Sequence, residues 1–193
     1  MLTRKPFFYL RHGQTDWNLA NRAQGQTDVP LNATGKAQAR DAVAGLRQCS
    51  ITSIFSSPLQ RALETAEVFQ KALNLPLQVI DDLKESNWGD REGLPKDGWF
   101  EDWLGGAVPN GAESLESFLQ RALGGLNLAL SAPGPVLIVA HGGTYWAVER
   151  FAPFHRAWDL PNACPVQHIP PSKGAPEWRR NELAPPSLKQ SMR

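Results

Sequence analysis

Cysteine is scarce in this 193-residue chain, in which only Cys49 and Cys164 occur, far apart in the sequence. Two distant cysteines exclude a disulfide-rich scaffold and a CxxC metal motif. The HxH and HExxH patterns that bind zinc are also missing. We therefore expect neither a metal site nor a structural disulfide framework.

An excess of charge of one sign is lacking as well, because 20 basic and 19 acidic residues give a net charge of +1. Proteins that bind nucleic acid or a membrane surface usually carry a basic face, so we expect neither partner. No apolar run approaches the roughly 20 residues of a membrane-spanning helix. The expectation is a cytoplasmic protein, and no pattern in the sequence indicates its oligomeric state.

The chain has the length of one globular domain over residues 1–193, and its 41% hydrophobic content supports one core. Apolar runs alternate with helical stretches, which predicts an α/β fold with a mostly parallel sheet. The predicted strands are residues 7–10, 51–55, 77–80, 135–140 and 177–183. The predicted helices are residues 34–47, 58–73, 113–130 and 143–151.

Helix-capping residues precede two of these helices. Thr34 is placed to cap the first. Ser57 is placed to cap the second, with Pro58 at the first helical position and Gln60 closing a capping box. Residues 87–111 are rich in Gly, Pro and Trp, and we predict a loop with one short helix there. From about residue 184 the chain is rich in proline, and we expect it to be loosely ordered.

Three of the predicted strands run directly into residues that suit anion binding. They are followed by Arg11-His12-Gly13, by Ser56-Ser57-Pro58 with Arg61 close behind, and by His141-Gly142-Gly143. The carboxyl ends of parallel strands meet at one edge of a sheet, so these side chains should converge. Arginine presents a planar donor fork that matches phosphate oxygens, and glycine lets the backbone approach an anion. This pattern predicts a phosphate site.

Such a set of residues suits phosphoryl transfer, in which positioning and charge neutralisation supply most of the catalysis. A neutral imidazole is a competent nucleophile near neutral pH. A leaving alkoxide needs a proton, so we expect a carboxyl group beside the site to act as the acid.

The run Leu10–Asn18 resembles the signature of the histidine phosphatase superfamily, whose namesakes are the cofactor-dependent phosphoglycerate mutases. Further blocks resemble the family in the same order over about residues 7–183. They are Leu31–Ala39, Ser56–Ala66, Leu83–Glu85 with Trp88–Gly93, Gly111–Ser114, Val139–Gly143 and Asn162–Cys164. The resemblance implies a three-layer phosphoglycerate mutase-like fold, a small phosphorylated substrate, and no cofactor.

The resemblance also implies a role for each matching residue. His12 is the expected nucleophile, and Glu85 the acid that later activates water. The expected ligands of the phosphoryl oxygens are Arg11, Arg61, His141, Asn18 and the Gly142 backbone N–H. Two positions depart from the family pattern. Gln14 replaces the commoner Glu, and Arg91 stands where Trp is frequent and is expected to add positive charge at the substrate mouth.

Several alternatives remain open at this point. Asp81, Asp82 or Glu92 could be the acid in place of Glu85. Only residues 86–140 separate Glu85 from His141, and mutases of this family carry a longer insertion there, so a phosphatase is favoured over a mutase. A non-catalytic phospho-ligand binder is the third interpretation. His155 and His168 match no motif and are expected to be structural or exposed, and the tryptophans at 88, 99 and 103 to pack in the core or a lid.

Overall fold

The computed structural model describes residues 1–152 and 160–183, and within them six strands form one sheet in the order β3-β2-β4-β1-β5-β6. The strands are β1 (Phe7–Arg11), β2 (Ser53–Ser56), β3 (Leu77–Val79), β4 (Val136–Ala140), β5 (Pro165–Ile169) and β6 (Arg179–Glu182). Strands β3, β2, β4 and β1 pair in parallel, while β5 and β6 pair antiparallel. The predicted α/β class with a mostly parallel sheet is confirmed.

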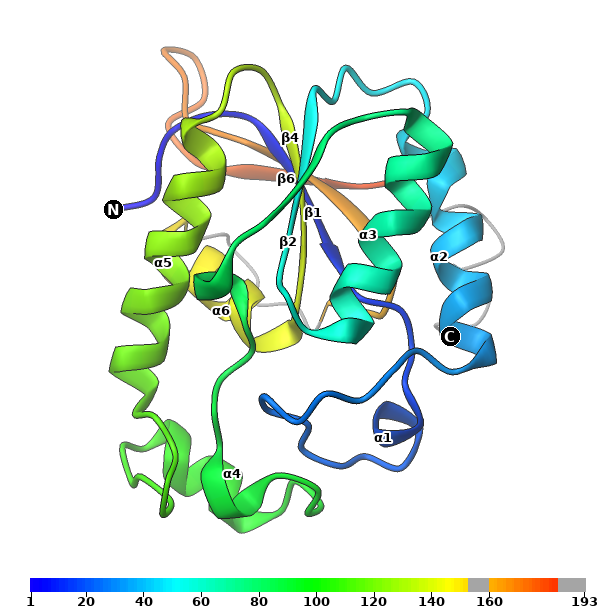
Figure 1. Ribbon diagram of the computed structural model, residues 1–193. Helices are drawn as coiled ribbons and strands as arrows, with labels where there is room; N and C mark the ends of the chain where they lie inside the picture. The colour runs from blue at the N-terminus through cyan, green and yellow to red at the C-terminus, as the bar shows by residue number, and fades with distance from the viewer. Residues whose placement is uncertain (153–159, 184–193) are drawn as a thin grey trace.

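Helices cover both faces of this sheet (Figure 1). Helices α2 (Ala33–Leu46) and α3 (Gln60–Leu73) pack together on one side, and α5 (Leu115–Ser131) and α6 (Gly142–Phe151) on the other. Shorter elements complete the described fold: α1 (Asp16–Leu19), α4 (Gly98–Leu104) and the 3₁₀ turns η1 (Asp81–Leu83) and η2 (Gly89–Arg91). Helices α1 and α4 lie beyond the end of the sheet at which α3 begins, low in Figure 1.

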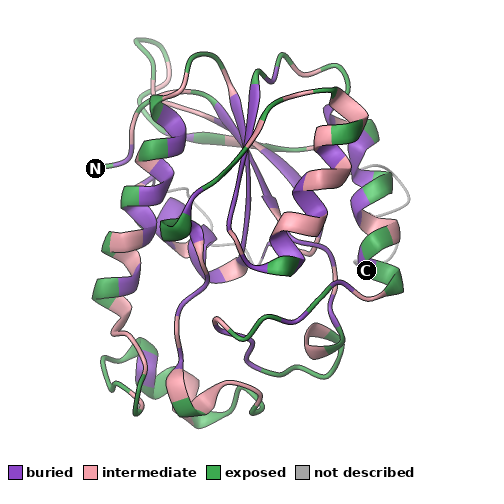
Figure 2. Cartoon of the chain, viewed as in Figure 1, coloured by how far each residue is buried: buried purple, intermediate pink, exposed green. Residues whose placement is uncertain are grey.

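The central strands are buried along their length, as the purple colour in Figure 2 shows. Every residue of β4 is inaccessible to solvent, which explains its continuous apolar sequence Val-Leu-Ile-Val-Ala. Helix α5 turns one face to this core, with Phe118, Ala122, Leu126 and Ala129 at intervals of three and four residues. A rigid, fully packed β4 therefore fixes the position of His141, which follows it directly.

Two of the predicted helix starts are wrong, each for a local reason. Helix α2 is capped by Asn32, whose Oδ1 accepts the Gly35 N–H at 2.8 Å, and not by Thr34. Helix α3 begins only at Gln60, because Asp28 Oδ1 accepts the Gln60 N–H at 2.6 Å from a distant segment. The cap of α3 thus comes from elsewhere in the chain, which leaves the Ser57 hydroxyl available for another partner.

Parts of the sequence-based expectations fall outside the described ranges, namely the loosely ordered end from about residue 184 and His155. Within the described residues, no helix has the length and apolar character to cross a membrane. His168 is buried in β5 as a structural residue, where its ring stacks on Phe7 with the centroids 4.5 Å apart.

Burial, reinforced by Arg180, lowers the pKa of His168 from 6.5 to about 3. The unfolded chain binds a proton at this site below about pH 6.5, whereas the folded chain does not, so stability falls as the pH drops from 6.5 toward 3. His168→Met removes this titration. We expect the loss of unfolding free energy between pH 7 and pH 5 to be about 2 kcal/mol smaller in the variant. Urea denaturation at both pH values measures it, and equal losses in the two proteins would contradict the prediction.

Candidate active site

A small cavity of about 30 Å³ lies at the carboxyl ends of the parallel strands. It is lined by Arg11, His12, Asn18, Arg22, Gln24, Arg61, Glu85, Trp88 and Lys96. His141 stands directly behind it, since the His12 and His141 ring centroids are 5.2 Å apart. The structure therefore brings together the residues that follow β1, β2 and β4. We call this space the inner cavity.

The His12 ring is buried and held in one orientation. Its Nδ1 lies 2.7 Å from the Gly13 carbonyl oxygen, and only a protonated Nδ1 can donate to a carbonyl. The lone pair of the neutral ring is then on Nε2. Burial, together with the charges of Arg61 and Arg11, holds the pKa of His12 well below its usual value, against the opposing effect of the Gly13 hydrogen bond. The ring is consequently neutral and nucleophilic at neutral pH.

Arg61 is fully buried in the first turn of α3. Its Nη1 donates to the Thr27 carbonyl at 3.0 Å and its Nη2 to the Gly25 carbonyl at 2.7 Å. The buried Nε–H has no hydrogen-bond partner among the described residues. Burial lowers the pKa of Arg61 to about 10, which still leaves it charged at neutral pH. Two backbone carbonyls thus fix a permanent cation with an unpaired donor in the wall of the inner cavity, where an anion could satisfy that donor.

His141 supplies a second donor of this kind. Its Nε2 lies 2.8 Å from the Ser57 hydroxyl, which also accepts the Leu59 N–H. The Ser57 O–H can donate to Nε2, and the proton of His141 is then on Nδ1. That nitrogen is buried and, in the part of the chain that the structure covers, has no hydrogen-bond partner. Burial, followed by Arg61 and His12, lowers the pKa of His141 well below its usual value, so it is a neutral donor. Ser57 therefore orients His141 rather than capping α3.

Two asparagines position the segment that carries His12. Asn18 lies in α1, and its Oδ1 accepts the backbone N–H and the hydroxyl of Thr15, both at 3.1 Å. Asn162 donates from Nδ2 to the His12 carbonyl at 2.9 Å. Arg11 donates from Nη1 to the Leu160 carbonyl at 2.8 Å, which ties its side chain to the segment before β5. Sequence reasoning placed Asn162 at the approach to a strand and missed its contact with His12.

Glu85 is buried and is the carboxylate that lines the inner cavity among the four considered as the acid. One oxygen accepts the Ser86 N–H at 2.9 Å and the other the Gly143 N–H at 3.0 Å. A Cβ added to Gly143 would overlap Glu85 Oε1, so a larger residue at this position would displace the Glu85 carboxylate. The preceding Gly142 opens α6, where the helix N-terminus favours an anion.

The three other carboxylates are placed differently. Asp81 and Asp82 are exposed on η1, and Asp81 pairs with Lys84 at 2.6 Å. The Glu92 carboxylate accepts hydrogen bonds from the Gln26 N–H, the Trp88 N–H, and both the N–H and hydroxyl of Thr27. Glu92 therefore fastens the same loop whose carbonyls hold Arg61, and its oxygens are occupied by that task.

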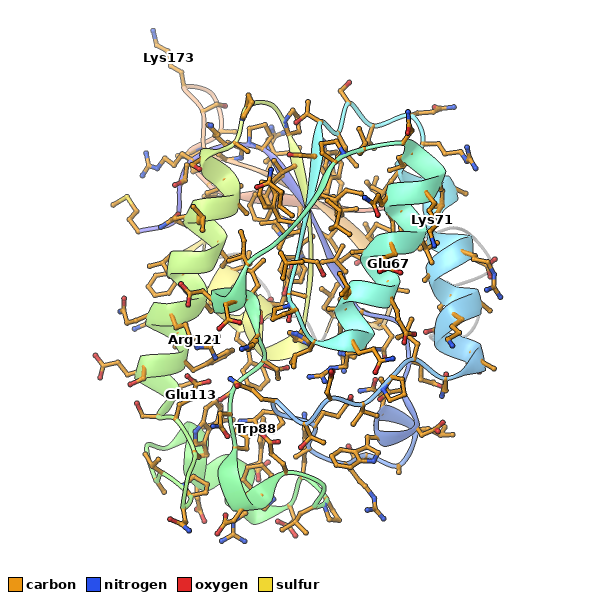
Figure 3. All side chains as sticks on the ribbon, viewed as in Figure 1. Glu67, Lys71, Trp88, Glu113, Arg121 and Lys173 are labelled. Atoms are coloured by element: carbon orange, nitrogen blue, oxygen red, sulfur yellow. The ribbon has the colours of Figure 1, made fainter. Side chains whose placement is uncertain are left out.

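Arg121 of α5 anchors the segment that carries Glu85. It donates to the backbone carbonyls of Asp82, Lys84 and Glu85 at 3.0–3.2 Å. Its guanidinium also pairs with Glu113, which in turn accepts the Asn87 N–H. Figure 3 shows Arg121 and Glu113 side by side. This clamp holds the backbone on both sides of Glu85, and nothing in the local sequence around Arg121 reveals it.

A larger cavity of about 680 Å³ opens beside the inner one. It is lined by Arg11, Trp17, Asn18, Asn21, Arg22, Lys96, Phe100, Trp146, Glu149 and Asn162. Four of these residues line both spaces: Arg11, Asn18, Arg22 and Lys96. We call this space the outer cavity. The two cavities therefore form one continuous site with a narrow end and a wide end.

Arg91 does not lie where its expected role requires. It is on η2, its Nε is 3.3 Å from Asp90 Oδ1, and it lines neither the inner nor the outer cavity. Positive charge at the mouth comes instead from Arg22 and Lys96. Neither residue follows a buried strand, so the rule that located the other cations could not find them.

The tryptophans form the packed cluster that we expected. Trp88 and Trp103 are buried, with ring centroids 6.1 Å apart, and Trp99 lies 5.9 Å from Trp88. Trp88 also forms part of the inner cavity wall. Across residues 1–152 and 160–183, no group of three or more His, Cys, Asp or Glu side chains is arranged to hold a metal ion.

The fold and the site together define an α/β protein with a buried, neutral histidine in a pocket lined by cationic side chains. The chain belongs to the histidine phosphatase superfamily (branch 1), whose sequence model matches residues 7–167. It is 44% identical over 161 residues to "Uncharacterized phosphatase PhoE" of Bacillus subtilis (strain 168), which covers 80% of this chain and 83% of the relative. It is 32% identical over 148 residues to "Probable phosphoglycerate mutase GpmB" of Proteus mirabilis (strain HI4320), covering 70% and 68% of the two chains.

Solved structures lead to the same family. A mycobacterial glucosyl-3-phosphoglycerate phosphatase in complex with VO3 superposes with a TM-score of 0.77 at 29% identity, covering 93% of this chain and 98% of that one. A phosphoglycerate mutase from Thermus thermophilus superposes with a TM-score of 0.74 at 29% identity, covering 94% and 99%. The relatives are named both phosphatases and mutases, and the phosphoglycerate mutase-like fold is confirmed.

Proposed function

We propose that this chain hydrolyses small phosphomonoesters through a phosphohistidine on His12 and without a metal ion. The observation that carries the proposal is the fixed His12 ring, which shares the inner cavity with Arg61 and lies 5.2 Å from the His141 ring, each of these two residues having a buried, unpaired donor. Arg61 and His141 can satisfy those donors with phosphoryl oxygens. A pure binding protein needs neither a buried nucleophile nor an adjacent buried carboxyl group, so this combination supports turnover.

The reaction has two displacements at phosphorus. In the first, His12 Nε2 forms a bond to phosphorus while the ester P–O bond breaks, and protonated Glu85 gives its proton to the leaving oxygen. In the second, the Glu85 carboxylate takes a proton from water, the water oxygen bonds to phosphorus, and the P–N bond breaks. Inorganic phosphate leaves, and His12 and Glu85 regain their starting protonation states. Arg11, Arg61 and His141 stabilise the negative charge on the transferring group, with Asn18 and the Gly142 N–H as further donors.

Hydrolysis is favoured over mutase chemistry by the short connection between Glu85 and His141. Residues 86–140 hold only η2, α4, α5 and β4. A mutase must retain its phosphorylated intermediate and exclude water, and this connection leaves few residues beyond those elements to cover the site. The relative at 44% identity is named a phosphatase, whereas those named mutases lie at 31–34%. A phosphoglycerate mutase activity is the second candidate, supported by those relatives.

Turnover of p-nitrophenyl phosphate in excess EDTA tests the proposal. We expect full activity after chelation, and a rapid acid-labile phosphoryl label on His12 in quenched samples. Incubation with 3-phosphoglycerate should release inorganic phosphate without forming the 2-phospho isomer. Loss of activity on chelation would contradict a metal-independent reaction, and isomer formation faster than phosphate release would establish the mutase instead.

Glu85→Gln tests the proton donor separately. We expect kcat for an alkyl phosphate to fall about 10²–10⁴-fold, because the alkoxide then leaves without a proton. p-Nitrophenolate is a stable anion, so its release should fall much less. Asp82→Asn is the matched control and should leave both rates unchanged, since Asp82 is exposed outside both cavities. Equal losses for the two substrates in Glu85→Gln would show that Glu85 is not the acid.

A further inference from the structure

Three aromatic side chains from three separate elements line the outer cavity. Trp17 comes from α1, Phe100 from α4 and Trp146 from α6, and each is half-buried. Rings that serve only the core are normally buried completely, as Trp103 is here. The three rings instead leave part of their surface facing one space next to the phosphate site. The outer cavity, which is otherwise lined by polar and charged residues, therefore has an aromatic part that suits a flat group.

These rings are held in place by their surroundings. Phe100 packs on Trp146 with ring centroids 5.7 Å apart. The Trp17 ring lies against Gly93, where an added Cβ would stand 3.2 Å from it and where the backbone φ of +85° also favours glycine. The aromatic wall is thus preformed, and binding to it requires little ordering of side chains.

The two cavities differ in volume, so each suits a different part of a substrate. The inner cavity, at about 30 Å³, accommodates little more than a phosphoryl group. The outer cavity, at about 680 Å³, is in the range of roughly 300–1,000 Å³ that holds drug-sized ligands. A three-carbon phosphate ester would leave most of the aromatic wall without contact. The alcohol portion that fits this space is larger and carries a ring.

We infer that the preferred substrates are monophosphate esters of alcohols bearing a planar ring, either an aryl group or a nucleobase, which packs against Trp17, Phe100 and Trp146. The inference rests on the proposed hydrolase activity and adds the chemical class of its leaving group. Stacking on aromatic side chains supplies the attraction. Asn21 and Asn162 line the same cavity and can pair with polar atoms at the edge of the ring.

Two matched substrate pairs test this inference. One pair is adenosine 5′-monophosphate and ribose 5-phosphate, and the other is 2-phenylethyl phosphate and ethyl phosphate. In each pair only the first compound carries the planar ring, and the bond that breaks is a primary alkyl ester in all four. We expect the ring to raise kcat/KM about tenfold or more in at least one pair. A higher kcat/KM for the ring-bearing ester in both pairs would show that the site accepts any planar ring. A higher value in one pair would show a preference for that type of ring. Ratios near one in both pairs would overturn the inference.

For each pair, the ratio of kcat/KM with the ring to kcat/KM without it measures the ring preference. Trp17→Leu should lower this ratio by about tenfold in any pair where the ring raises it, because the substitution removes one of the three aromatic rings. Phe151→Leu is the control, since Phe151 is a half-buried aromatic of α6 outside the outer cavity, and the ratio should stay as in the parent protein. A ratio that is unchanged in Trp17→Leu contradicts the inference. If all four esters and p-nitrophenyl phosphate resist cleavage, the hydrolase proposal fails, whereas cleavage without ring preference rejects only the substrate class.

Discussion

His12→Ala is expected to lower kcat at least about 10⁴-fold, since loss of a covalent nucleophile removes the whole two-step route. Binding of inorganic phosphate should change far less. Arg11, Arg61 and His141 remain in place, and the Nε2 lone pair does not bind phosphate oxygens. We expect the Kd for phosphate to rise by less than tenfold, measured by calorimetry, while phosphatase turnover is measured on the same preparation.

This separation of turnover from binding distinguishes a nucleophile from a structural histidine. A structural role for His12 would weaken phosphate binding and thermal stability together with turnover. Retention of more than a tenth of the parent kcat would contradict the phosphohistidine route. Activity that is lost in parallel with phosphate binding would instead assign His12 to holding the anion.

Arg61→Met is expected to lower kcat/KM about 10³-fold or more, because a buried cation that meets the transferring phosphoryl group is removed. Arg61→Lys should restore little of this. The guanidinium of Arg61 holds the Gly25 and Thr27 carbonyls with its two Nη atoms and keeps Nε–H for the ligand. A lysine ammonium on a flexible stem cannot reproduce that planar fork.

Lys71→Met is the control for Arg61, since Lys71 is an exposed cation near the other end of the same helix (Figure 3). It should leave kcat/KM unchanged. Circular dichroism and urea denaturation check that Arg61→Met remains folded, because the substitution leaves the buried Gly25 carbonyl and the Thr27 carbonyl without this donor. Recovery of a tenth or more of the parent kcat/KM in folded Arg61→Lys would show that charge alone is sufficient at this position.

Much of the fold was predictable because the parallel strands are buried on both faces. Such strands have continuous apolar sequences, and β4 is the clearest example. The helix boundaries were less accurate wherever the cap comes from another segment. At α3 the N-cap residue Leu59 has no side-chain cap, and the Gln60 N–H is accepted by Asp28 from more than thirty residues earlier in the chain. Short-range capping rules cannot detect such a partner.

The centre of the candidate site was predictable for a related reason. His12 and His141 follow strands that pair in parallel, so their convergence follows from the sheet itself. Glu85 does not follow a strand of this kind, and the residue patterns alone left its neighbours as rivals. Its burial and its place in the wall of the inner cavity, which the other three carboxylates do not line, separate it from them.

The wide end of the site could not be predicted from the sequence. Trp17, Lys96 and Phe100 lie on short or irregular elements, and no periodic pattern links them to Trp146 of α6. The same is true of Arg121, whose bonds to the backbone before and at Glu85 span more than thirty residues. Contacts between side chains and segments far apart in the sequence leave no local signal.

Strand β1 pairs on one side with β4 and on the other with β5. Both partners are translated more than one hundred residues after it, so Phe7–Arg11 leaves the ribosome long before either neighbour exists. The nascent chain therefore carries an apolar strand with both edges unpaired until residues 136–140 have been made, and with one edge unpaired until residues 165–169 follow. Assembly around β1 is a late, long-range event, and fragments that stop short of β5 should aggregate instead of acquiring a working site.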